Sequence, residues 1–180
     1  MADGGASTII MLVTALLISS AASAVLVSEW SSTSRVIQQQ QKGLQLSEEI
    51  GIGFAGDPMM VSIQFAANPG DFNEITFYIQ NTGLHTMDEN SLAVIVDGIT
   101  LDDSSITNLQ FFPNTATDWD PSVLLEVKLE DEAFDNYDED MAANPSGTKE
   151  ISLFAIARSN SISGISMSTE MVEEVQLNES

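Results

Sequence analysis

Residues 6–27, ASTIIMLVTALLISSAASAVLV, form a run of 22 residues without a charged side chain. As an α-helix this run is about 33 Å long, which matches the roughly 30 Å hydrocarbon core of a bilayer. The run therefore predicts one N-terminal transmembrane helix that is attached to the rest of the chain. A cleaved secretory signal is the alternative, because residues 21–24 resemble a cleavage site. No Lys or Arg precedes the run, and we expect the helix to be retained.

Within this helix Ala15, Ser19 and Ser23 are spaced four apart and share one face. Small residues at that spacing let two helix backbones approach closely in lipid, although Ala and Ser are also simply tolerated there. Residues 29–50 are mostly polar and contain no Pro, which predicts a helical neck, with a flexible linker as the alternative. We therefore divide the chain into a transmembrane helix (1–28), a neck (29–50) and a domain (51–180).

Beyond the neck the apolar residues recur at every second position, as in half-buried strands. The clearest example is Val123, Leu125, Val127 and Leu129, which alternate with Glu126 and Lys128. Similar runs begin near residues 61, 75, 92 and 151, and a last strand is expected to begin near Ile162. Turn sequences such as Asp97-Gly98 separate these runs. Six to eight short strands with such turns predict a mainly β fold, an antiparallel immunoglobulin-like β-sandwich preceded by the long helix.

The charge of the chain limits its partners. It carries 27 acidic and 5 basic residues, a net charge of −22, and after Ile50 only Lys128, Lys149 and Arg158 oppose 23 carboxylates. Nucleic acid is excluded as a partner because phosphate contacts need clustered Lys and Arg. Arg35 and Lys42 after the helix favour a cytoplasmic domain by the positive-inside rule. An inside-negative potential favours an acidic domain outside, and we expect the β domain to lie outside the cell membrane.

Residues 130–140 hold seven carboxylates among eleven residues, and this segment is expected to be a solvated acidic loop. Asp135, Asp138 and Asp140 are weak candidates for calcium ligands, since the spacing and the glycine of an EF-hand are missing. The single histidine, His85, follows a turn sequence and is expected in a loop rather than as a catalytic base. There is no cysteine and no nucleophile or phosphate-loop motif. The sequence predicts a protein without catalytic activity and without a cofactor.

The segment from Glu74 to Gly98 contains the most specific pattern. A strand (residues 74–80) leads into Asn81-Thr82-Gly83, and a second strand (residues 91–96) ends at Asp97-Gly98. This arrangement is similar to the strand–NTG–strand–DG core of the soluble domains of archaellum stator proteins, the FlaG and FlaF types. The lead-in at residues 46–50 looks like the FlaG type in particular. The resemblance covers about residues 6–100.

The resemblance implies a non-enzymatic part of an archaeal motility machine. It would be a stator subunit in the cell membrane whose β-sandwich self-associates and contacts a second stator protein and the surface layer. The alternative is an archaellin or pilin-like filament subunit, whose N-terminal helices pack into a filament core. Archaellins carry a basic residue and Gly ahead of that helix, whereas no Lys or Arg precedes Gly4-Gly5. The stator is our expectation, and the filament subunit and an anchored adhesion domain remain open.

Overall fold

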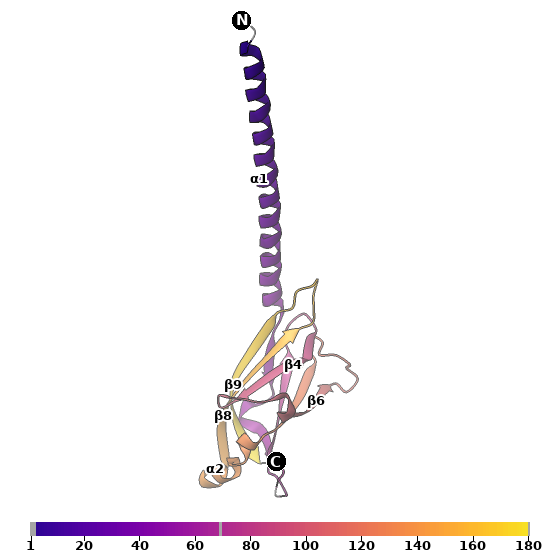
Figure 1. Cartoon of the computed structure of the whole chain (residues 1–180). Coiled ribbons are helices and arrows are strands. Elements are labelled where there is room, and N and C mark those ends of the chain that lie inside the picture. Colours follow the sequence, from indigo (N-terminus) through magenta and orange to yellow (C-terminus); the bar gives the residue numbers. More distant parts are fainter. Residues whose placement is uncertain (1–2, 69, 180) are drawn as a thin grey trace. The chain divides into compact units, whose positions relative to one another are not determined.

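The computed structural model describes residues 3–68 and 70–179, which divide into two compact units, with the boundary along the chain between Leu44 and Gln45. The helix α1 (Asp3–Glu49) makes up the first unit and supplies the first residues of the second. It is uninterrupted (Figure 1), so the segment between the apolar run and the β domain is helical. The absence of Pro from this helix keeps every interior backbone N–H available as a donor.

The second unit is built almost entirely of short strands. They are β1 (Ile52–Ala55), β2 (Val61–Gln64), β3 (Glu74–Asn81), β4 (Met87–Val96), β5 (Ile99–Thr100), β6 (Ile106–Phe112), β7 (Leu124–Glu130), β8 (Thr148–Ser159) and β9 (Ser168–Glu179). Three short 3-10 helices lie between them, η1 (Pro58–Met60), η2 (Asp103–Ser105) and η3 (Glu132–Phe134), together with the helix α2 (Tyr137–Ala143).

The strands follow the hydrogen-bonded order β5-β4-β8-β9-β2-β3-β7-β6, and β1 also pairs with β3. This curled sheet has two halves. In the first half β1 and β2 both border β3, followed by β7 and β6; in the second half β9 borders β8, followed by β4 and β5. We letter β1 and β2 together as A, and β3, β4, β6, β7, β8 and β9 as B to G. The first half is then the ABED sheet of an immunoglobulin-like sandwich and the second half is its CFG sheet, with β5 as a short extra strand. The expected sandwich is confirmed.

One pair departs from the expected antiparallel pattern. Strand β2 pairs antiparallel with β3 and parallel with β9, through Val61 opposite Leu177 and Ile63 opposite Glu179. The cause lies just before β2, where Asp57 and Pro58 interrupt the extended chain and Asp57 accepts a hydrogen bond from the backbone N–H of Met59. This break offsets β2 from β1, so that β2 bridges the two halves of the sheet.

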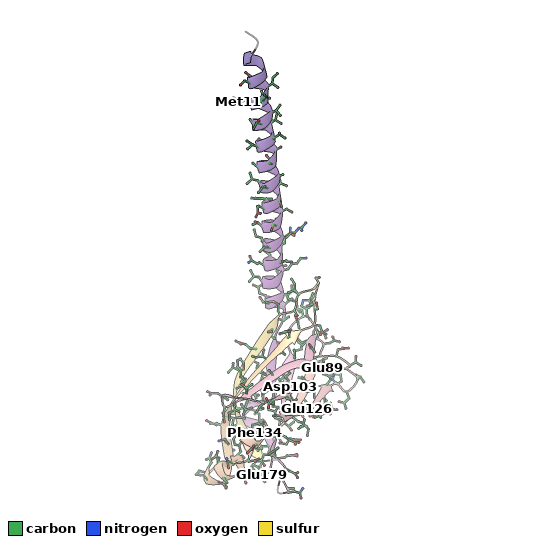
Figure 2. All side chains as sticks on the ribbon, in the orientation of Figure 1. Met11, Glu89, Asp103, Glu126, Phe134 and Glu179 are labelled. Carbon is green, nitrogen blue, oxygen red and sulfur yellow. The ribbon has the colours of Figure 1, made fainter. Side chains whose placement is uncertain are left out.

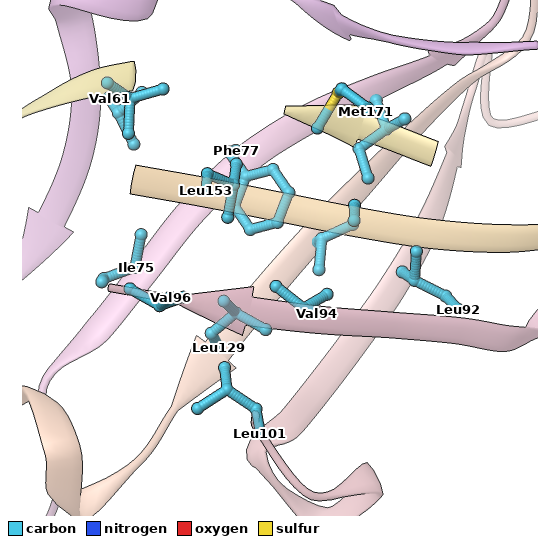
Figure 3. Packing of buried hydrophobic residues seen from close by; sticks show 14 of the residues in the cluster. Val61, Ile75, Phe77, Leu92, Val94, Val96, Leu101, Leu129, Leu153 and Met171 are labelled. Carbon is cyan, nitrogen blue, oxygen red and sulfur yellow. The ribbon is translucent and has the colours of Figure 1, made fainter. Parts of the chain in front are cut away.

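The core lies between the two halves and is formed by the inward-facing residues of the strands other than β5, whose two residues are exposed. Residues that alternate with polar ones in the sequence are fully buried, such as Leu125, Val127 and Leu129 of β7, each 0% exposed. Figure 3 shows Ile75 and Phe77 of β3 packed with Val94 and Val96 of β4, Leu153 of β8 and Leu129 of β7. Because strands of both halves contribute, the burial of this cluster stabilises the packing of the two halves against each other.

Three details differ from the sequence-based expectations. The last strand begins at Ser168, since Ile162 and Ile165 face each other across a turn that contains Ser163 and Gly164 at positive φ. Strands β1, β5 and β6 were not expected. The acidic segment is not wholly a loop, because its residues form η3 and α2, with Phe134, Tyr137 and Met141 buried. Carboxylates in the first turn of α2 favour this helix through its dipole.

Candidate functional site

The apolar part of α1 has no cover within the described part of the chain. Its large side chains are 51–75% exposed. There are eleven of them: Ile9, Ile10, Met11, Leu12, Val13, Leu16, Leu17, Ile18, Val25, Leu26 and Val27. Figure 2 shows side chains that project outward from this helix around Met11. By length and composition α1 can cross a membrane, a test that a signal sequence near an N-terminus also passes. A continuous apolar surface of this size needs lipid or other protein chains to cover it.

Two hydroxyl groups in the apolar run of this helix are bonded to the helix backbone. Thr14 donates a hydrogen bond to the Ile10 carbonyl (2.8 Å), and Ser20 donates one to the Leu17 carbonyl (2.9 Å). Their polar hydrogens are therefore satisfied by the helix itself. Ala15, Ser19 and Ser23 lie on the same element and are exposed, so within the described chain they are free to face another helix. Their role in helix packing remains a prediction.

The Asn81-Thr82-Gly83 sequence forms the turn between β3 and β4, and it is held by one buried side chain. Asn81 is 0% exposed. Its amide nitrogen donates to the carbonyls of His85 and Trp119, both at 2.8 Å, and its carbonyl oxygen accepts from the backbone N–H of Gly83 at 3.0 Å. One side chain thus fixes the turn and joins it to the segment before β7.

The same turn binds the junction between α1 and β1. The backbone N–H of Gly83 donates to the Gly51 carbonyl (3.1 Å), and that of Leu84 donates to the Glu49 carbonyl (2.7 Å). A Cβ at Gly83 would lie 2.7 Å from the Gly51 nitrogen and 2.8 Å from the Glu49 oxygen, so only glycine fits. His85 pairs with Glu49 at 2.7 Å. The motif that carried the resemblance therefore has a structural role at the start of the domain, and His85 lies in the loop as expected.

Asp97 and Gly98 form the turn between β4 and β5, with φ values of 50° and 80°. The Asp97 carboxylate accepts hydrogen bonds from the Ser152 backbone N–H (2.8 Å) and from the Tyr137 hydroxyl (3.2 Å). Burial, and then the nearby Asp97 carboxylate, raise the pKa of Tyr137 well above its usual range. The turn thus joins the sheet to α2.

The three candidate calcium ligands lie on or beside α2. Asp135 ends η3, and Asp138 and Asp140 lie in the first turn of α2. Asp140 is paired with the Lys149 amine at 2.7 Å, and this amine also lies 4.5 Å from the centre of the Tyr137 ring. Among residues 3–68 and 70–179 no three His, Cys, Asp or Glu side chains come together as a metal-binding group. Asp140 takes part in an ion pair with Lys149, and calcium binding by the three carboxylates stays a prediction.

The chain was compared with known proteins. No curated protein matches it. The sequence model of the archaeal-type flagellin family matches residues 2–153, a segment that includes α1 and the sandwich as far as β8. Because this match extends over most of the 180 residues and unites the uncovered apolar helix with the β domain, the chain belongs to the archaeal-type flagellin family.

Proposed function

We propose that this protein is a filament subunit of an archaeal flagellum, in which the α1 helices of many copies pack together and the β-sandwich forms the outer surface. The observation that carries this proposal is an uncovered apolar helix in a chain that belongs to the archaeal-type flagellin family. Full burial of a large aliphatic side chain stabilises by roughly 1.5–3 kcal/mol, so covering eleven of them amounts to roughly 15 kcal/mol or more per chain. Self-assembly through α1 supplies that cover outside a membrane.

The family supports the same conclusion. Archaeal-type flagellins are structural, non-enzymatic archaellum components. The membership of this chain in that family favours a filament subunit over the stator that the sequence pattern first suggested. We infer that α1 anchors each subunit in the cell membrane before assembly, with the acidic domain outside. In the filament, Ala15, Ser19 and Ser23 would let neighbouring helices approach, because small side chains bring two backbones close together.

A stator of the FlaG type is the second candidate. The specific observation in its favour is the resemblance of β3, the Asn81-Thr82-Gly83 turn, β4 and the Asp97-Gly98 turn to the soluble domain of that group. In that case α1 would remain in the membrane, and the sandwich would bind a second stator protein or the surface layer. The two candidates differ in what covers α1, which is protein in the filament and lipid in the stator.

The test is to shear filaments from native cells and to quantify this protein by mass spectrometry in the filament and envelope fractions. A filament subunit is abundant in sheared filaments and is depleted from the envelope. Retention in the envelope, with only traces in the filaments, would refute the filament proposal and support the stator. The N-terminal peptide read in the same experiment shows at which residue the native subunit begins.

A further inference from the structure

Strand β6 is an edge strand without a charged residue or a proline, and its pairing with β7 is irregular only at its start, between Ile106 and Asn108. It is the last strand of the hydrogen-bonded order, and among the described strands it pairs with β7 alone. Its seven residues, ITNLQFF, include no charge, no Pro and no Gly. Natural sheets usually block such edges with charges, prolines, β-bulges or very short strands, because an open edge exposes unpaired N–H and C=O groups to other chains. The irregularity of β6 precedes Asn108, and residues 108–112 pair with β7 without a shift in register.

The other edges of this sandwich are less suited to a second copy of the chain. The outer edge of β4 carries Asp88 and Glu89, and β5 covers only two residues of it. Strand β9 carries Glu170, Glu173 and Glu174 along the part beyond its pairing with β2. Like charges on two copies of a chain with net charge −22 repel each other at these edges. Strand β1 is uncharged, but it has only four residues.

A groove of about 490 Å³ runs beside β6, where the two halves of the sandwich leave the core open. Ile106 and Leu109 of β6 line it together with Leu92 of β4, and Glu89 and Asp103, both labelled in Figure 2, also line it. Ile106 and Leu109 are only partly buried although they pack against the core. The edge therefore combines unpaired backbone groups with apolar side chains that further burial would stabilise.

We propose that β6 is an interface between two copies of this chain, in which the two β6 strands pair antiparallel about Gln110. In this register Gln110 of one copy lies opposite Gln110 of the other, and Leu109 lies opposite Phe111. Residues directly opposite each other in an antiparallel pair point to the same face. Leu109 and Phe111 both pack against the core, whereas Gln110 lies opposite the outward-facing Glu126 of β7. The apolar side chains of both copies therefore meet on the same face of the joined sheet.

The pairing is isologous, since each copy uses the same strand. This contact is not one of those that build the proposed filament. Subunits within one helical filament are related by head-to-tail contacts, so an isologous contact joins subunits of two neighbouring filaments. The outcome is lateral pairing of filaments through the outer surface of the sandwich.

Because the chain contains no cysteine, a single introduced cysteine reports this contact directly. The Cβ atoms of facing residues in an antiparallel pair lie about 4.5–5.5 Å apart, close to the separation that a disulfide spans. We expect Gln110→Cys in the full chain in detergent micelles to form a covalent dimer on mild oxidation. The control is Val172→Cys on β9, a position that is 62% exposed. Equal yields for the two variants, or no dimer for Gln110→Cys, would overturn the proposal.

A charge exchange tests the same register independently of any association through α1. Tagged Gln110→Lys is expected to capture untagged Gln110→Glu several-fold better than untagged Gln110→Lys, because opposite charges then face each other. Glu126 on β7 lies opposite position 110 and offers a lysine there an acidic neighbour, so this variant should fold. Equal capture of both partners would refute β6 pairing. Failure of the wild-type chain to occur in filaments would refute the filament proposal and leave this result unaffected.

Discussion

The side chain of Asn81 offers the sharpest test of how the sandwich is held together. Substitution by Ala removes three hydrogen bonds, two donated to the carbonyls of His85 and Trp119 and one accepted from Gly83. A hydrogen bond contributes about 1 kcal/mol net, so the loss is about 3 kcal/mol. The Trp119 carbonyl retains its bond from the Met87 N–H, and the Gly83 N–H retains its bond to Gly51. Only the partly buried His85 carbonyl loses its donor, which keeps the penalty near this value.

We expect Asn81→Ala to lower the melting temperature of the β domain by roughly 10 °C, because 1 kcal/mol corresponds to about 4 °C for a domain of this size. The measurement is thermal unfolding of the full chain in detergent micelles, followed by the fluorescence of the buried Trp119 in a Trp30→Phe background. The chain has only these two tryptophans, so the signal then comes from the sandwich alone. Asn160→Ala is the control, because Asn160 is exposed and its backbone, not its side chain, is bonded in the described chain.

The Asp variant distinguishes the donors from the acceptor. Asn81→Asp keeps an oxygen that can accept from Gly83, but it places the other carboxylate oxygen against two carbonyls at 2.8 Å. A buried, charged carboxylate oxygen that faces two carbonyl oxygens lowers the stability of the folded state. Asn81→Asp should therefore unfold at a lower temperature than Asn81→Ala. The reasoning fails if Asn81→Ala melts within 1 °C of the unsubstituted chain, or if the Asp variant is the more stable of the two.

Three further substitutions test other parts of the molecule. Gly83→Ala should lower the free energy of unfolding, measured in urea, by about 1–3 kcal/mol, because its Cβ would lie 2.7–2.9 Å from backbone atoms of residues 49–51. Gly43→Ala is the control and should not lower it, because a Cβ at Gly43 meets open space. The pKa of Tyr137 is raised in the folded protein, so the folded state favours the protonated phenol. The stability that this preference contributes is fully present below about pH 10, the pKa of a free tyrosine, and is lost as the pH rises through the pKa of the folded state. Tyr137→Phe should therefore weaken the alkaline loss of stability, and an identical slope of stability against pH would contradict this. Ser19→Phe should block filament assembly seen by electron microscopy while the melting temperature of the sandwich stays the same; normal filaments would exclude this face from helix packing.

The sequence alone determined the two regular features of this chain. The uncharged run at residues 6–27 predicted the apolar helix, and the alternation around Leu125 and Val127 predicted the half-buried strand β7 and, with similar runs, the β-sandwich. Both are local signals, since each depends on residues within a few turns of helix or one strand. The Asp97-Gly98 turn belongs to the same class, because two positive φ values at adjacent positions leave few sequences possible.

The tertiary structure decided what joins these elements. Asn81 and Trp119 are 38 residues apart in the sequence and meet only when β3 and the segment before β7 come together. Strand β6 has no clear alternation, and it becomes a strand because β7 offers it a hydrogen-bonding edge. The acidic segment becomes helical where the sheet buries Phe134, Tyr137 and Met141. Neither the sequence nor the fold of one chain decides what covers α1, because no described part of the chain buries this helix. A single sequence specifies the local periodicity of helices and strands. The pairing of strands depends on which apolar surfaces, distant in the sequence, are buried against each other.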